Sequence, residues 1–153
     1  MIKYILPLFA AILILAACEK ETDYAAVDDA AILKYIADSN LTATKTASGV
    51  YYIVEEPGTG ELPLTTSMVH VRYKGYLLDG TLFGKTNSDS YMKLYLDDDG
   101  YIPGFREGLR YFKKGSTGTI FIPSDLAYGA SSKDAITSHS VLIYKIELIS
   151  IYN

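Results

Sequence analysis

The sequence predicts an α+β domain, in which an antiparallel β-sheet carries one short helix on a face, with a further helix placed before it. Apolar and polar residues alternate with a period of two along much of the chain after Val50, as half-buried strands require. Apolar residues recur at helical spacing within residues 28–38 and again around Phe105. Strands that follow one another, without a helix between each pair, are typical of antiparallel sheets.

The first 17 residues predict a lipoprotein signal peptide that is removed. Lys3 precedes an uncharged, mostly apolar run that ends at Leu15-Ala16-Ala17-Cys18. The run is shorter than the ~20 residues of a membrane-spanning helix, and it has the three regions of a secretory signal. Leu-Ala-Ala-Cys resembles a bacterial lipobox, which implies that Cys18 becomes the acylated first residue. We therefore expect a lipid anchor in the cell envelope, on the periplasmic side of the outer membrane, with surface display left open.

The composition limits the class of protein further. Cys18 is the only cysteine, so the mature chain forms no disulfide and depends on a packed core. The formal net charge is −4, and the loss of Lys3 makes it −5. The sequence contains no basic cluster, which argues against nucleic acid and against electrostatic binding to anionic lipid. One monomeric domain, held at the membrane by its acyl chains, is the expectation.

The segment before the domain predicts a tether, a helix and a linker. Residues 19–22 are polar, and residues 28–38 carry aspartates where a helix N-terminus favours them. Ile32, Tyr35 and Ile36 form one apolar stripe suited to docking on the domain. Residues 40–49, rich in Thr, Ser and Ala, predict a linker. We therefore divide the mature chain into an extension, residues 18–48, and a domain, residues 49–153.

The strands of the domain follow from alternation. Between residues 69 and 77, apolar positions alternate with polar ones such as His70, and Asp79-Gly80 then predicts a hairpin turn. Further strands are expected at residues 91–96, 117–122 and 140–151. Phe105, Leu109 and Phe112 repeat at helical spacing, and Gly115 predicts the end of that helix. This helix would cover the sheet.

Four segments resemble, in family order, those of FKBP-type peptidyl-prolyl isomerases. They are residues 71–83 (Val-Arg-Tyr-Lys-Gly-Tyr-Leu-Leu-Asp-Gly-Thr-Leu-Phe), 101–109 (Tyr-Ile-Pro-Gly-Phe-Arg-Glu-Gly-Leu), 122–129 (Ile-Pro-Ser-Asp-Leu-Ala-Tyr-Gly) and 141–148 (Val-Leu-Ile-Tyr-Lys-Ile-Glu-Leu). The resemblance covers about residues 49–151. It implies an FKBP-like twisted antiparallel sheet wrapped around one short helix, with a shallow apolar pocket, and cis-trans isomerisation of prolyl bonds in exported proteins.

Prolyl isomerisation places modest demands on side chains. Rotation of the amide crosses a barrier of about 18–20 kcal/mol because resonance flattens the bond. An enzyme needs only to favour the twisted transition state over the planar ground states. A dry aromatic pocket does so, because the twisted amide is the less polar form. No nucleophile, metal or cofactor is therefore expected, and the partners are proline-containing polypeptides.

The resemblance assigns roles to nine residues. Tyr73 and Phe83 form walls, Phe105 is the floor that receives the proline, and the N–H of Ile102 and the hydroxyl of Tyr128 hold peptide carbonyls. Further substrate contacts are implied for four residues: Tyr101, Met92, Ile136 and Tyr144.

Three departures from the family pattern keep an alternative open. Gly84 stands where an aspartate is usual, Phe105 where tryptophan is commonest, and the loop at residues 129–138 is shorter by about one residue. The alternative, favoured by Gly84, is an FKBP-like peptide-binding or chaperone module with weak or no turnover. A structural lipoprotein, whose domain is a scaffold for the N-terminal helix, has the least support.

Other residues that suggest chemistry predict no site. Asp97, Asp98 and Asp99 are consecutive and lack the alternating spacing of a calcium loop, so an acidic turn is expected. His70 and His139 have no partner at metal-ligand spacing, so they are predicted to be surface or loop histidines. Ser124 has no Gly-x-Ser-x-Gly context, which argues against a hydrolase.

Overall fold

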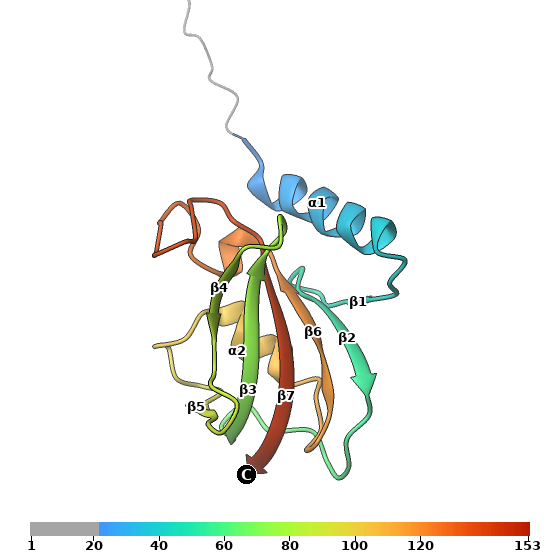
Figure 1. Cartoon of the computed structure of the whole chain (residues 1–153), viewed down its shortest axis with the longest axis vertical. Helices are drawn as coiled ribbons and strands as arrows, with labels where there is room; N and C mark the ends of the chain where they lie inside the picture. Colours follow the sequence, from blue (N-terminus) through green and yellow to red (C-terminus); the bar gives the residue numbers. More distant parts are fainter. Residues whose placement is uncertain (1–21) are drawn as a thin grey trace, which may run out of the picture.

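The computed structural model describes residues 22–153. The predicted signal peptide, Cys18 and residues 19–21 of the predicted tether lie outside this range. Figure 1 shows the elements in chain order: α1 (Tyr24–Asp38), β1 (Thr44–Lys45), β2 (Tyr51–Glu56), β3 (Met68–Leu77), β4 (Leu82–Lys85), β5 (Met92–Tyr95), α2 (Pro103–Leu109), β6 (Thr117–Ile122), the 3₁₀ turn η1 (Ser124–Leu126) and β7 (Leu142–Tyr152). Within the described range, no helix is long and apolar enough to span a membrane.

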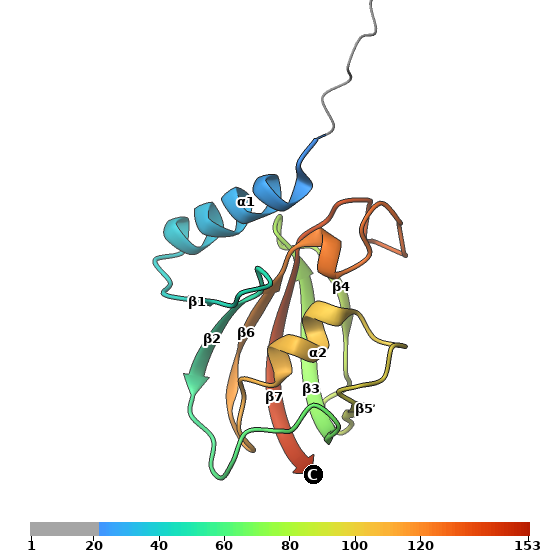
Figure 2. The same ribbon diagram turned by 180° about the vertical axis from the view of Figure 1, so that it is seen from behind.

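All strand pairs are antiparallel, in the order β1-β2-β6-β7-β3-β4, and β5 pairs with β3. β3 and β7 are the longest strands and pair from Met68↔Tyr152 to Leu77↔Leu142. α2 lies behind these central strands in Figure 1 and in front of them in Figure 2, so it covers one face. The predicted α+β class is confirmed.

The main core fills the space between α2 and the sheet. Gly104 and Gly108, one helical turn apart, let α2 approach β6 closely, because a Cβ on either would overlap Ile122 or Ile120. The buried residues of this core are Val50, Val69, Val71, Leu94, Leu96, Phe105, Leu109, Phe112, Ile120, Ile122, Ile136, Leu142, Tyr144, Ile146 and Leu148. This close approach holds α2, which carries Phe105, against the sheet.

A second, smaller core lies between α1 and the opposite face of the sheet. Tyr51, Phe121 and Ile143 stand side by side on β2, β6 and β7, and all three are buried. Ile32 and Ile36 of α1 complete this cluster, and Tyr35 packs on Phe121 with ring centroids 5.8 Å apart. The apolar stripe predicted for docking therefore docks. β6 is therefore buried on both faces from Gly118 to Ile122, whereas the alternation of its residues predicted one solvent-exposed face.

The structure differs from the predictions in both helices and in the linker, and the ends of the predicted strands differ by at most two residues. α1 begins at Tyr24 instead of residue 28, because Asp23 caps it by accepting the N–H of Ala26 at 3.2 Å. The predicted linker contains β1, which pairs with β2. α2 ends at Leu109, and Gly115 instead uses a φ of +79° in the turn before β6. Phe112 lies beyond the end of the helix. It is nevertheless buried in the core, because the turn after α2 directs its side chain to the same side as Phe105 and Leu109.

His70 is buried in β3 instead of lying on the surface. Only 8% of it is exposed, and it stacks on Tyr91 at 4.3 Å between ring centroids. Within residues 22–153, its Nε2 has no hydrogen-bond partner. Burial, together with the positive charge of Lys93, lowers the pKa of His70. The folded state therefore favours the neutral ring.

This lowered pKa predicts that acid destabilises the protein through His70. As pH falls below about 6.5, the unfolded chain binds a proton at His70 before the folded chain does, so the free energy of unfolding decreases. The His70→Phe variant keeps a stacking ring and removes the titration. Urea unfolding at pH 7.5 and pH 5.5 should show a smaller loss of stability in His70→Phe than in the wild type. Equal losses in the two proteins would contradict this account.

Candidate active site

α2 supplies the floor of the predicted pocket. Pro103 occupies the first helical position, where its missing N–H costs nothing, and the extended Ile102 precedes it. Phe105 then lies on the buried face of the helix and is 2% exposed. The carbonyl of Ile102 accepts the N–H groups of Phe105 and Arg106, whereas the N–H of Ile102 has no acceptor among the described residues. That N–H is available to a ligand.

Three aromatic rings, from β3, β4 and β7, meet above the Phe105 ring of α2. The Tyr144 ring centroid lies 4.4 Å from Phe105 and 5.4 Å from both Tyr73 and Phe83. Tyr73 and Phe105 are 6.1 Å apart in an edge-on arrangement. These separations lie in the favourable range for aromatic pairs. Residues from β3, β4, α2 and β7 thus form one aromatic cluster.

The hydroxyl of Tyr144 lies inside this cluster. Burial raises its pKa above the ordinary value, and the neighbouring hydroxyls of Tyr128 and Tyr73 add to the shift. Tyr144 therefore stays neutral throughout the physiological range. Tyr128, from the loop after η1, packs against the same core.

The remaining predicted residues join the same core. Ile136 is buried at 4% exposure, at the turn where its N–H and carbonyl bond to Lys133. The Tyr101 hydroxyl donates to the carbonyl of Lys93 at 3.2 Å, which ties the loop before α2 to β5. Four of the predicted residues are partly buried against the core at its edge: Met92, Tyr101, Ile102 and Tyr128.

Gly75 is a residue of the site to which sequence reasoning assigned no role. A Cβ at this position would overlap the Phe83 ring, so Phe83 reaches its place only because β3 has glycine there. The signal was a glycine inside a strand, which often marks a close approach of another group.

Gly84, opposite Gly75 on β4, has room for a side chain. A Cβ there would lie 3.5 Å from the hydroxyl of Tyr73, an ordinary contact. The position where the family usually has an aspartate therefore faces the aromatic cluster.

The acidic residues before α2 form a turn. Asp98 accepts the N–H of Gly100 at 2.8 Å, and Asp99 pairs with Arg106 at 2.9 Å. Residues 22–153 contain no group of three or more His, Cys, Asp or Glu side chains near enough to hold a metal.

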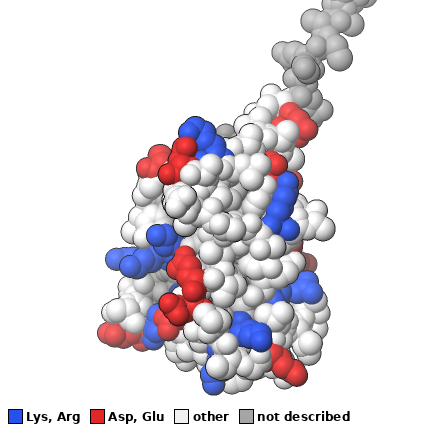
Figure 3. All heavy atoms as spheres, turned by 90° about the vertical axis from the view of Figure 1, so that its right-hand side faces the viewer, with Lys and Arg blue, Asp and Glu red and all other residues white. Residues whose placement is uncertain are grey.

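Charges of both signs are intermixed on the face seen in Figure 3. One groove, lined in part by residues of β3, β4 and β7, has more basic than acidic side chains. Lys74 stands directly opposite Lys85 on β4 and Lys145 on β7. These lysines line a groove of about 790 Å³ together with Arg72 and Glu147, which form an ion pair at 3.1 Å. Strand pairing thus brings together lysines that are far apart in the chain, which the linear sequence does not reveal.

Comparison with known proteins identifies close similarity over most of the domain. The sequence model of the family described as FKBP-type peptidyl-prolyl cis-trans isomerase matches residues 60–149. The peptidyl-prolyl isomerase FkpA of Escherichia coli K12 is 40% identical over 111 residues, covering 70% of this chain and 40% of FkpA. Outer membrane protein MIP of Legionella longbeachae is 39% identical, covering 68% of this chain and 45% of MIP. The chain thus matches less than half the length of these relatives.

Solved structures agree with this result. The crystal structure of Escherichia coli FkpA superposes with a TM-score of 0.71 at 34% identity, covering 84% of this chain and 61% of FkpA. A peptidyl-prolyl isomerase from Pseudomonas syringae gives a TM-score of 0.70 at 30% identity, covering 84% of this chain and 96% of that protein. The sequence match, the sheet wrapped around α2 and the shared structure lead to one conclusion: the chain belongs to the FKBP-type peptidyl-prolyl cis-trans isomerase family.

Proposed function

We propose that this protein is a peptidyl-prolyl cis-trans isomerase that assists the folding of exported proteins. The observation that carries the proposal is the contact of Phe105 with Tyr144 and Tyr73 at the centre of an aromatic cluster. An apolar surface of this kind favours the twisted prolyl amide, which is less polar than either planar form. The mechanism is noncovalent and needs no cofactor.

Each residue has a distinct part in this mechanism. The Phe105 ring receives the proline, between walls formed by Tyr73 and Phe83. The free N–H of Ile102 and the hydroxyl of Tyr128 donate to carbonyls on either side of the prolyl bond. Tyr144 stays neutral, so it adds no charge that would favour the more polar planar amide. The outer contacts to the peptide come from Met92, Tyr101 and Ile136.

The proposed location is the periplasmic side of a bacterial outer membrane, with the mature protein anchored through acylated Cys18. The relative named outer membrane protein MIP supports an envelope location. α1 begins at Tyr24, so Cys18 lies at most about 20 Å along an extended chain from the first helix. An extension of this length, residues 18–48 with α1, would hold the isomerase domain, residues 49–153, close to the membrane surface.

The test is protease-coupled isomerisation of proline tetrapeptides by residues 19–153. The wild type should accelerate exchange above the uncatalysed rate. Tyr128→Phe should lower kcat/KM by about three- to tenfold, since a hydrogen bond of this kind contributes about 0.5–1.5 kcal/mol. A folded wild type with no rate above background would reject the enzyme. In that case, binding of the same peptides would support the second candidate, a peptide-binding module, which Gly84 favours.

Gly84→Asp tests whether the missing acid limits the rate. Its Cβ fits beside the Tyr73 hydroxyl at 3.5 Å, so the carboxylate has space to accept a hydrogen bond from that group. We expect kcat/KM to be no lower than in the wild type and up to about tenfold higher. A tenfold rise corresponds to a decrease of about 1.4 kcal/mol in the activation free energy. Gly84→Ala separates the effect of the side chain from that of the charge. A clear fall in Gly84→Asp but not in Gly84→Ala would show that the acid harms this site.

A further inference from the structure

α1 lies outside the family match, yet it binds the segment that carries Tyr128. Asp28 on α1 is 3% exposed, and its Oδ2 accepts the backbone N–H of Ser124, the first residue of η1, at 2.7 Å. A carboxyl group buried in this way costs free energy unless it is well bonded. Apolar residues alone could dock α1 on the sheet without a buried carboxylate. The bond between Asp28 and η1 therefore indicates a role for Asp28 other than docking.

A second contact from α1 reaches the far end of the same loop. The Tyr24 ring stacks on His139, with centroids 3.4 Å apart and planes 5° from parallel. His139 adopts a φ of +55°, which is uncommon for residues other than glycine, and its N–H donates to the carbonyl of Gly129 at 2.7 Å. The first two turns of α1, through Asp28 and Tyr24, therefore contact both ends of the loop from Ser124 to His139.

The bonds around Ser124 carry this restraint to Tyr128. The Ser124 carbonyl accepts the N–H of Ala127 at 3.0 Å and that of Gly129 at 2.7 Å. These two residues flank Tyr128 directly. Because Asp28 accepts the N–H of the same Ser124, the position of α1 is linked through this one residue to the backbone on both sides of Tyr128.

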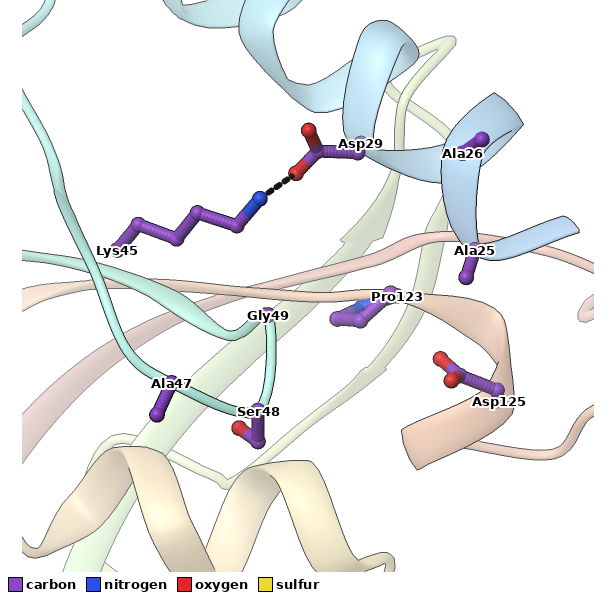
Figure 4. Close-up of a pocket in the computed structure, with 9 residues that line it drawn as sticks. All are labelled: Ala25, Ala26, Asp29, Lys45, Ala47, Ser48, Gly49, Pro123 and Asp125. Atoms are coloured by element: carbon purple, nitrogen blue, oxygen red, sulfur yellow. Dashed lines mark hydrogen bonds and ion pairs between the residues drawn. The ribbon is translucent and has the colours of Figure 1, made fainter.

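α1 is itself firmly attached to the sheet. Ile32 and Ile36 are buried against it, and Asp29 accepts the Tyr51 hydroxyl at 2.6 Å and Lys45 Nζ at 2.5 Å. Figure 4 shows α1 lying over Pro123 and Asp125, with the Asp29–Lys45 pair beside a cavity of about 310 Å³. Asp29 thus binds the sheet and its linker, whereas its neighbour Asp28 binds the loop.

We propose that α1 is a positioning element of the active site, in which Asp28 acts through η1 to place the hydroxyl of Tyr128. The inference rests on the proposed function, since it assigns to α1 the geometry of a residue that holds the substrate. Tyr24 contributes by fixing the other stem of the loop. An undocked α1 would leave the aromatic floor intact and loosen the loop above it.

Hydrogen exchange tests the structural part of this inference without any need for activity. In Asp28→Ala, the amides of Ala127 and Gly129 should exchange at least about tenfold faster than in the wild type, because local opening of the loop becomes easier. Asp29→Ala is the matched control: it removes the adjacent acid, which bonds to Tyr51 and not to the loop. Unchanged exchange at Ala127 and Gly129 in Asp28→Ala, or an equal rise in Asp29→Ala, would overturn the inference.

Kinetics test the link to Tyr128. Asp28→Ala should lower kcat/KM by about three- to tenfold, and the double variant Asp28→Ala/Tyr128→Phe should be no slower than Tyr128→Phe, because both changes remove one interaction. Asp28→Asn keeps an oxygen for the Ser124 N–H and should restore most of the activity. Losses that add in the double variant would reject the role. An inactive wild type with faster loop exchange in Asp28→Ala would reject the proposed function and leave the loop restraint standing.

Discussion

Phe105→Leu is expected to lower kcat/KM for prolyl isomerisation by at least about tenfold while the protein stays folded. Leucine fills much of the buried space, so the loss of stability should be smaller than the loss of about 3–5 kcal/mol expected for Phe105→Ala. The contacts of the ring with Tyr144 at 4.4 Å and Tyr73 at 6.1 Å disappear, and with them the flat surface that receives the proline. Tetrapeptide isomerisation and urea unfolding of the same variant measure the two effects.

Phe112→Leu is the matched control for this experiment. Phe112 is also fully buried, but it packs edge-on to Tyr52 at 6.3 Å, away from the aromatic cluster. We expect a similar loss of stability with kcat/KM unchanged within about twofold. If the two leucine variants lose equal activity, the loss comes from general loosening of the core and Phe105 is not the floor of the site. Phe105→Ala, with an expected loss of about 3–5 kcal/mol in stability, is the less informative change.

Gly118→Ala is expected to destabilise the fold by at least about 3 kcal/mol. A Cβ at Gly118 would overlap the carbonyl oxygen of Ile53 on β2 and lie 2.5 Å from the Phe112 ring. Overpacking usually costs about 1–3 kcal/mol when side chains yield. Here the nearest group is backbone in the adjacent strand, so β2 must move away from β6 to relieve the contact. Urea unfolding should show this as a large fall in the midpoint.

Gly84→Ala provides the comparison, because it makes the same change in another strand. Its Cβ would meet only the Tyr73 side chain at 3.5 Å. Alanine also reduces the conformational freedom of the unfolded chain, so stability should be unchanged or higher by up to about 1 kcal/mol. Similar losses in Gly84→Ala and Gly118→Ala would show that strand glycines matter here for a reason other than space.

The local pattern of the sequence was sufficient to predict most elements of the sheet. Alternation along β3 and β6 and the Asp79-Gly80 turn predicted their strands and hairpin, since each depends on residues within about ten positions of one another. The family motifs also pointed to Tyr73, Phe83, Phe105 and Tyr144, whose rings the structure brings into contact. Their assigned roles remain predictions until they are tested by substitution.

Errors arose where a residue's environment depends on a distant segment. The burial of His70 depends on Tyr91 and Tyr152, and the basic groove depends on the register that sets Lys74 between Lys85 and Lys145. Asp28 was assigned to the start of a helix because aspartate favours that position. Its actual partner is the N–H of Ser124, which is 96 residues away.

The sequence by itself determined the family, the strand-rich architecture and the aromatic residues of the candidate site, because periodicity and short motifs are encoded by neighbouring residues. Only the tertiary structure decided that α1 covers the second face of the sheet, that Gly75 makes room for Phe83, and that Asp28 binds the loop carrying Tyr128. Those contacts join residues far apart in the chain, and a folded backbone is needed to bring their atoms within bonding distance.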